Sequence, residues 1–207
     1  MRASGPAVTG KWVLEVLTGF AVSSAAIFVA ELGDKSQLMA MTFATRFRAW
    51  QVLLGITLAT TVVHAASVAL GFGLGSALPT NWIGLVAGLA FLGFAAWTLR
   101  GDHLTEAEKS RAGRMAGSAV LAVTVAFFLA ELGDKTMLAT VTLAAQHDWL
   151  GTWIGSTLGM VLADALAIGV GMLLGKHLPE RAIRYGAAAL FAVFGVWLTV
   201  DGVLGLL

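Results

Sequence analysis

Two near-identical hexapeptides decide the fold: ELGDKS at residues 31–36 and ELGDKT at residues 131–136. Each lies within a long apolar stretch of a 207-residue chain that is 58% hydrophobic and only 12% charged. A soluble domain would carry about a quarter charged residues. The composition is therefore that of an integral membrane protein, and the net charge of +1 gives no sign of a nucleic-acid partner.

The hexapeptides belong to a duplication that spans the chain. A shift of 100 residues aligns the two halves without a gap, and 8 of the 11 positions from residue 28 to residue 38 are identical to their partners. Farther from the hexapeptides, Gly55 matches Gly155 and Phe91 matches Phe191. An internal repeat of this kind decides the architecture before single elements are assigned.

Six apolar segments are long enough to cross a bilayer, which takes about 20 residues per helix. They cover roughly residues 16–43, 50–78, 82–99, 115–145, 149–175 and 185–206. Residues 1–100 and 115–207 then form two three-helix repeats, joined by a polar linker at 101–114. Because three is odd, the second repeat must enter the membrane from the opposite side. The predicted fold is an all-α integral membrane protein of six transmembrane helices in two inverted three-helix repeats, as in many secondary transporters.

The distribution of basic residues predicts the orientation. Loops after the first, third and fifth spans hold nine lysines and arginines, whereas the opposite side has only Arg2 and Lys11. Cytoplasmic loops carry the excess of Lys and Arg. We therefore expect both termini outside and the central linker in the cytoplasm.

The acidic residues of the hexapeptides are the candidate site. Glu31 and Asp34 are three residues apart, which on a continuous helix places both carboxylates on nearly the same face. Glu131 and Asp134 repeat the spacing, and an inverted two-fold relation would bring all four together near the membrane midplane. Burying ionised acids in a membrane is costly, so the cluster needs cations or protons.

Two lysines, Lys35 and Lys135, supply only two positive charges against four carboxylates. A divalent cation would balance the remainder. Carboxylate oxygens suit Mg²⁺, Ca²⁺ or Mn²⁺, and the absence of cysteine argues against a thiolate site. Protons would neutralise the same oxygens in the absence of metal, which is the physical basis of exchange.

Other small or polar residues lie close to the acids in the sequence. Gly33 and Gly133 are expected to break the helix and free backbone carbonyls around a cavity. Ser36 and Thr136 are expected either to cap the second half-helix or to offer a hydroxyl.

Asp164 and His64 occupy equivalent positions in the middle of two spans. Polar residues at such depth suggest a functional role by default. Two interpretations stay open: the pair relays protons, or it forms a hydrogen bond that fixes helix packing.

A purely structural interpretation of the hexapeptides is also open. In it, each glutamate pairs with the lysine four residues later in its own hexapeptide, and each aspartate caps a helix. The duplication weakens this interpretation, because pairing at a helix end does not require the same residues twice.

The hexapeptides resemble the signature of a known family: Glu, a hydrophobic residue, Gly, Asp, Lys or Arg, then Thr or Ser, once in each half of a six-span protein. Both copies match at all six positions. The family is that of divalent cation/proton antiporters, which includes Golgi calcium/manganese transporters of eukaryotes and Mne-type manganese exporters of bacteria. The resemblance implies that Glu31, Asp34, Glu131 and Asp134 bind the ion. It also implies export from the cytoplasm, with Mn²⁺ favoured in bacterial members and Ca²⁺ also carried by eukaryotic ones.

We therefore predict a secondary transporter of the bacterial inner membrane, not an enzyme, that exports Mn²⁺ or Ca²⁺ in exchange for protons by alternating access. The expected partners are divalent metal ions, protons and the lipid bilayer, with no cofactor, and a homodimer is compatible with the sequence. The residues expected to support the site or couple protons are Lys35, Lys135, Ser36, Thr136, Asp164 and His64.

Three alternatives differ in class. The first is an exporter of small organic cations such as basic amino acids, whose ammonium group the acids would hold. The second is an intramembrane hydrolase that uses Ser36 and His64, which would leave Thr136 without a purpose. The third is a structural or assembly subunit, whose stability would not respond to ions.

Overall fold

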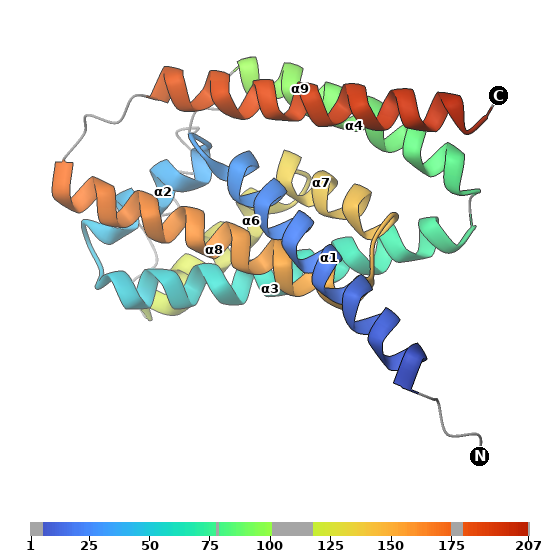
Figure 1. Cartoon of the computed structure of the whole chain (residues 1–207). Helices are drawn as coiled ribbons and strands as arrows, with labels where there is room; N and C mark the ends of the chain where they lie inside the picture. Colours follow the sequence, from blue (N-terminus) through green and yellow to red (C-terminus); the bar gives the residue numbers. More distant parts are fainter. Residues whose placement is uncertain (1–5, 78, 101–117, 175–179, 207) are drawn as a thin grey trace.

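Figure 1 shows the computed structural model of the chain, which describes residues 6–77, 79–100, 118–174 and 180–206. Within these ranges the structure is entirely helical. The helices are α1 (Pro6–Glu31), α2 (Lys35–Ala44), α3 (Ala49–Ala77), α4 (Thr80–Arg100), α6 (Ala119–Glu131), α7 (Lys135–Ala144), α8 (Trp149–Leu174) and α9 (Glu180–Leu204). Both halves follow the same order, in which the second helix has ten residues.

Several helices are long and apolar enough to span a membrane. Within the described residues there are five such stretches: Gly10–Glu31, Ala49–Ala77, Trp82–Arg100, Trp149–Leu173 and Arg184–Leu204. Large apolar side chains such as Leu14, Phe72 and Leu173 are exposed on the helices, which is typical of a surface covered by lipid. The chain is therefore a multi-pass membrane protein.

The first and fourth predicted spans are each divided into two helices. The segment at 16–43 consists of α1 and α2, and the segment at 115–145 contains α6 and α7, with residues 115–117 outside the described part. The division falls at the hexapeptides in both cases. Of the two first helices, α1 is long enough to span a membrane by itself, whereas α6 is apolar but shorter.

The first helix of each half packs against a long helix of the other half. α1 packs along α8, and α6 packs along α3. A Cβ atom added to Gly155 would lie 2.4 Å from the carbonyl oxygen of Phe20, and one added to Gly55 would lie 2.9 Å from that of Val120. Small residues let helix backbones approach this closely in a membrane, so equivalent glycines permit equivalent contacts in the two halves.

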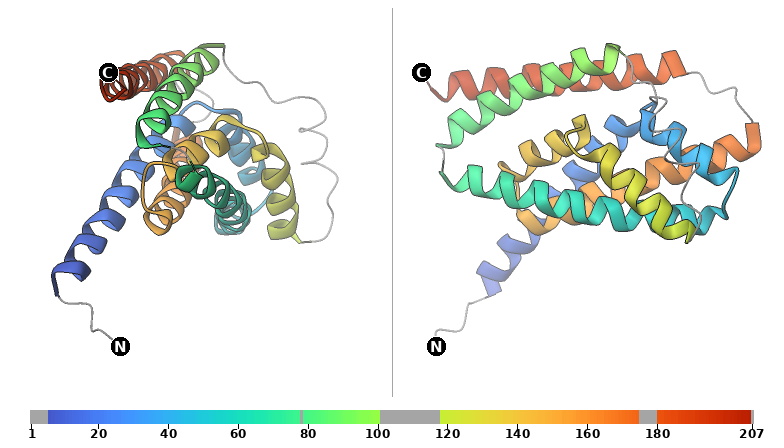
Figure 2. Two further views of the ribbon diagram at one scale, coloured as in Figure 1. Left: turned by 90° about the vertical axis from the view of Figure 1, so that its right-hand side faces the viewer. Right: turned by 180° about the vertical axis from the view of Figure 1, so that it is seen from behind.

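Two further helices, α4 and α9, lie side by side as a layer over the rest of the molecule (Figures 1 and 2). At their contact the rings of Phe91 and Phe191 have centroids 5.8 Å apart. Within the main body α3 contacts α8, where Thr60 Oγ1 lies 3.3 Å from Met160 Sδ. Residues that are 100 positions apart therefore meet where the two halves join.

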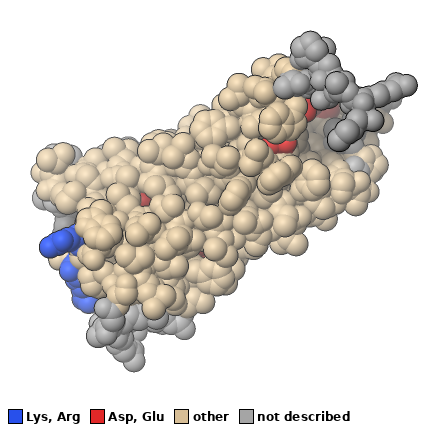
Figure 3. All heavy atoms as spheres, turned by 90° about the horizontal axis from the view of Figure 1, so that it is seen from below, with Lys and Arg blue, Asp and Glu red and all other residues tan. Residues whose placement is uncertain are grey.

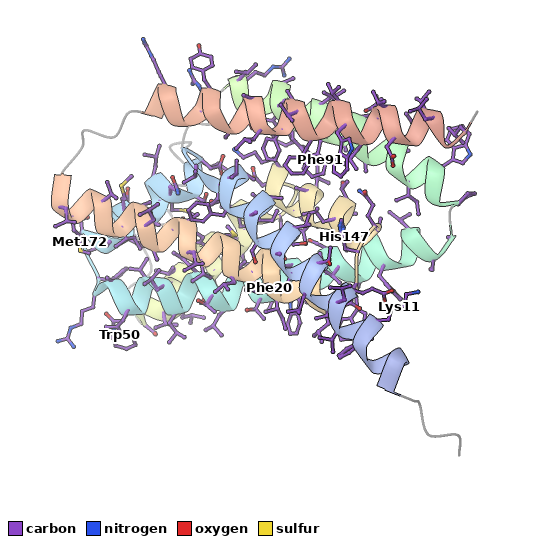
Figure 4. The ribbon with its side chains drawn as sticks, in the orientation of Figure 1. Lys11, Phe20, Trp50, Phe91, His147 and Met172 are labelled. Carbon is purple, nitrogen blue, oxygen red and sulfur yellow. The ribbon has the colours of Figure 1, made fainter. Side chains whose placement is uncertain are left out.

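The two ends of the molecule differ in the helix ends and the charged side chains that they hold. In Figure 1 the start of α1 and the end of α9 lie at the same end. Figure 4 shows Trp50, near the start of α3, and Met172, near the end of α8, together at the opposite end, so these two helices are antiparallel. Blue side chains visible in Figure 3 gather at that opposite end. The predicted linker at 101–114 lies outside the described residues.

Candidate functional site

Both hexapeptides interrupt a helix. The first helix of each half ends at the glutamate, and the next begins at the lysine. Between them Gly33 has φ 75° and Gly133 has φ 79°, a left-handed conformation that glycine adopts without steric cost. The predicted break at these glycines is confirmed. The prediction that Glu31 and Asp34 share one face of a continuous helix is wrong, because the helix ends between them.

The aspartates stand at the entrance to the short helices. Asp34 and Asp134 occupy the N-cap positions of α2 and α7 with extended backbones, at φ −80° and −76°. Neither side chain accepts a capping hydrogen bond from its helix, so both carboxylates remain available for contacts across the molecule. Since the cap positions belong to the aspartates, the prediction that Ser36 and Thr136 cap these helices is wrong.

The two hydroxyl groups instead contact the glutamates. Ser36 Oγ donates a hydrogen bond to the Glu31 carboxylate and lies 3.1 Å from Asp34 Oδ2. Thr136 Oγ1 donates to Glu131 Oε2 at 2.7 Å. Each hydroxyl thus orients the glutamate of its own hexapeptide, and the other predicted role, that of offering a hydroxyl to the site, stays a prediction.

The lysines form crossed ion pairs between the halves. Lys135 Nζ pairs with Asp34 Oδ1, and the two side chains are 4% and 0% exposed. Lys35 Nζ lies 3.4 Å from Asp134 Oδ1, and these side chains are 19% and 2% exposed. Each lysine therefore balances the aspartate of the other hexapeptide. The interpretation in which each lysine pairs with its own glutamate is wrong.

The acids of the two halves converge inside the protein. All four motif carboxylates are buried, and the charge of Glu31 interacts with those of Glu131 and Asp34. Within the described part of the chain, Glu31 Oε2 and Glu131 Oε1 have no hydrogen-bond partner. A buried charged oxygen without a partner costs free energy, so this cluster requires a further neutralising group.

Among the residues that the structure describes, no three histidine, aspartate or glutamate side chains are close enough together to hold a metal ion. The acids are nevertheless near enough for their charges to interact.

Asp164 and His64 are fully buried, on α8 and α3. Within the described residues, neither carboxylate oxygen of Asp164 and neither ring nitrogen of His64 has a hydrogen-bond partner. The interpretation in which a hydrogen bond between the two fixes packing is therefore wrong, and the proton relay stays a prediction. The charge of Asp164 interacts with that of Asp34, which connects α8 to the first hexapeptide.

One residue of the site, Gln37, was given no role on the basis of the sequence. The backbone N–H of Gly33 donates to Gln37 Oε1 at 2.8 Å, and Gln37 Nε2 donates to the carbonyl oxygen of Ala163 at 3.0 Å. In the second half Met137 stands at this position, and the N–H of Gly133 lies 3.1 Å from its Sδ. The signal in the sequence that could have identified Gln37 is its polar side chain on an apolar segment directly after the hexapeptide.

Comparisons with known proteins agree on one family. The sequence profile of the divalent cation/proton antiporter GDT1 matches residues 19–106 and 119–205, one stretch in each half. A protein of Vibrio cholerae serotype O1 named "Putative manganese exporter" is 35% identical over 188 residues, which cover 87% of this chain and 90% of that protein.

Plant proteins are similar as well. The Arabidopsis thaliana protein PAM71, chloroplastic, is 33% identical over 210 residues, which cover 87% of this chain but only 56% of the plant protein. GDT1-like protein 5 of the same plant is 27% identical over 87% of this chain and 95% of its own length. No solved structure matches the chain significantly.

Proposed function

Because this chain belongs to the GDT1 divalent cation/proton antiporter family, we propose that it exports Mn²⁺ from the cytoplasm in exchange for protons, with Ca²⁺ as a second cargo. The choice of Mn²⁺ rests on the name of the similar Vibrio protein. The ion is the transported substrate, and the proposal includes neither a resident cofactor nor an enzymatic reaction.

The proposed ion ligands are the carboxylates of Glu31, Asp34, Glu131 and Asp134. The observation that carries the proposal is the crossed pairing of the lysines, in which an ammonium group of each half neutralises a buried aspartate of the other. The buried carboxylates of the site are thus already stabilised by cationic groups, as a bound metal ion would stabilise them. Hard oxygen ligands are those that Mn²⁺, Ca²⁺ and Mg²⁺ prefer.

The proposed cycle follows from keeping this site neutral. In the metal-free state the lysines and protons balance the carboxylates. A divalent cation binds only deprotonated carboxylates, so its arrival from the cytoplasm releases protons. After the site opens outward, protons replace the ion and reset the carboxylates, because an uncompensated cluster of charges is too costly to bury.

For the architecture we propose six spans, in which the broken helices α1–α2 and α6–α7 are the first and fourth. Residues 1–100 and 115–207 would then be inverted three-helix repeats. Two observations support this: α1 packs on α8 as α6 packs on α3, and the equivalent helices α3 and α8 are antiparallel. The exposed Arg46 and Arg48 favour the α2–α3 end as the cytoplasmic one. Both termini would lie outside a bacterial inner membrane. One chain supplies all four acids, so the mechanism needs no homodimer.

Transport by the purified chain tests the proposal. Proteoliposomes with an imposed proton gradient are assayed for Mn²⁺ movement with the wild type, Glu31→Gln, Asp134→Asn and Asp201→Asn. Both site variants are expected to lose transport by about tenfold or more, the factor that corresponds to 1.4 kcal/mol. Asp201→Asn removes an exposed acid from α9 and is expected to transport normally. Unimpaired transport by both site variants would reject the carboxylate mechanism.

The organic-cation alternative is tested on the same preparation. Melting temperatures are compared with Mn²⁺, Ca²⁺ or lysine added. Stabilisation by the metals but not by lysine is expected. Stabilisation by lysine alone would favour an exporter of basic amino acids.

A further inference from the structure

Asp164 is a fifth buried acid, whose charge interacts with acids of both hexapeptides. Its side chain is 0% exposed, and within the described residues neither of its oxygens has a hydrogen-bond partner. Its charge interacts with those of Asp34, Glu31 and Glu131. A buried carboxylate without a partner is costly until a cation or a proton neutralises it. Asp164 therefore has unused capacity to bind a cation and lies beside acids with the same need.

The packing of α8 holds Asp164 in this place. The preceding residue, Ala163, accepts the hydrogen bond from the side chain of Gln37, which lies on α2 immediately after the first hexapeptide. The same glutamine accepts a hydrogen bond from the N–H of Gly33, at the helix break. A continuous chain of two hydrogen bonds thus ties the break in the first hexapeptide to α8 beside Asp164.

The acids of the site outnumber its lysines. Two lysines, Lys35 and Lys135, supply two positive charges, against five negative charges when Glu31, Asp34, Glu131, Asp134 and Asp164 are all ionised. Three negative charges remain. One ion of charge +2 would cancel two of them, and one proton would cancel the third.

The two halves differ in one acid. The residue equivalent to Asp164 is His64, which adds no carboxylate. The two halves are therefore equivalent in backbone but unequal in the number of carboxylates that they bring to the site.

We propose that Asp164 is a further cation ligand, which makes the site asymmetric because His64 stands at the equivalent position of the other half. This inference rests on the proposed function and deepens it by adding a fifth carboxylate to the four of the hexapeptides. The hydrogen bonds of Gln37 link α8 to the break in the first hexapeptide.

Binding of Mn²⁺ to the full-length protein in detergent, measured by calorimetry, tests the inference. Asp164→Asn keeps the shape of the side chain and removes its charge. It is expected to weaken Mn²⁺ binding by about tenfold or more, the factor that corresponds to 1.4 kcal/mol. Asp201→Asn, which removes an exposed acid from α9, is the charge-matched control and should bind Mn²⁺ like the wild type.

Glu31→Gln separates the two proposals. If Glu31→Gln loses Mn²⁺ binding and Asp164→Asn does not, the asymmetric site is overturned and the proposed function stands. If both variants bind Mn²⁺ like the wild type, both proposals fail. A second measurement uses the unmodified protein, so that misfolding of a variant cannot obscure the result: anomalous scattering from a Mn²⁺-soaked crystal. An ion within coordination distance of Asp164 supports the inference, and an ion held only by hexapeptide acids overturns it.

Discussion

Removal of the buried lysine charge at residue 135 tests the crossed ion pairs directly. Lys135→Met keeps much of the side-chain length and deletes the ammonium group opposite Asp34. Both side chains of this pair are almost fully buried, at 4% and 0% exposure. Breaking a buried pair by removing one partner costs about 3–5 kcal/mol, because the other charge is left uncompensated. We expect Lys135→Met to lower the metal-free free energy of unfolding by about that amount.

Two other lysines of the chain provide graded controls. The Lys35 side chain is 19% exposed, and its Nζ lies 3.4 Å from Asp134 Oδ1, so Lys35→Met should be less destabilising than Lys135→Met. Lys11 and Glu15 form a pair at 3.9 Å with side chains 81% and 56% exposed. Pairs of this exposed kind contribute about 0.3–0.5 kcal/mol, so Lys11→Met should be nearly neutral.

The assay is the melting temperature of each purified variant with and without Mn²⁺. In Lys135→Met the metal takes over the neutralisation of Asp34, so Mn²⁺ should raise its melting temperature more than that of the wild type. Equal losses for Lys135→Met and Lys11→Met would refute the reasoning on burial. A variant that Mn²⁺ stabilises less than the wild type would refute the idea that lysine and cargo share the same carboxylates.

Two further predictions concern packing and the hydroxyl donors. A Cβ in Gly88→Ala would lie 2.3 Å from Thr199 Oγ1 and 2.4 Å from its backbone nitrogen, so α4 and α9 must separate, at about 1–3 kcal/mol. Gly93→Ala on the same helix meets nothing within 4 Å, and equal melting temperatures for the two variants would contradict the close contact. Thr136→Val removes the hydrogen bond to Glu131 and should cost about 1.5–3 kcal/mol in chemical unfolding. Thr136→Ser should recover most of that loss, and failure to do so would point to packing instead.

The convergence of the acids could be predicted from the sequence because it depends on the duplication alone. If two copies of a motif are related by a two-fold operation, residues near the axis must meet, whatever the details of each helix. The left-handed backbone at Gly33 and Gly133 was predictable for a similar reason, since glycine in a polar interruption favours a break. Both inferences use properties that side-chain packing does not alter.

The lysine partners could not be predicted, because they depend on the exact path of the broken helix. A spacing of four residues brings Glu31 and Lys35 together only if the helix continues between them. The break at Gly33 ends that relation, and Lys35 pairs with Asp134 instead. The closeness of Asp164 to the hexapeptides likewise results from packing of α8 against α1, α2 and α7, which no periodicity within α8 specifies.

Two differences between the halves, at positions 37/137 and 64/164, lie beside the hexapeptides, while glycines at close helix contacts are the same in both halves. Gly55 and Gly155 approach the backbone of a neighbouring helix so closely that a larger residue at either position would displace that helix. A change there would alter the packing itself, so the two halves keep the same residue. At two positions beside the hexapeptides the halves differ in polarity: His64 corresponds to Asp164, and Gln37 corresponds to Met137. Gln37 and Met137 nevertheless make equivalent contacts with the backbone N–H of the glycine in their own hexapeptide. A repeated scaffold can thus bring an additional carboxylate from one half without disturbing the packing on which both halves depend.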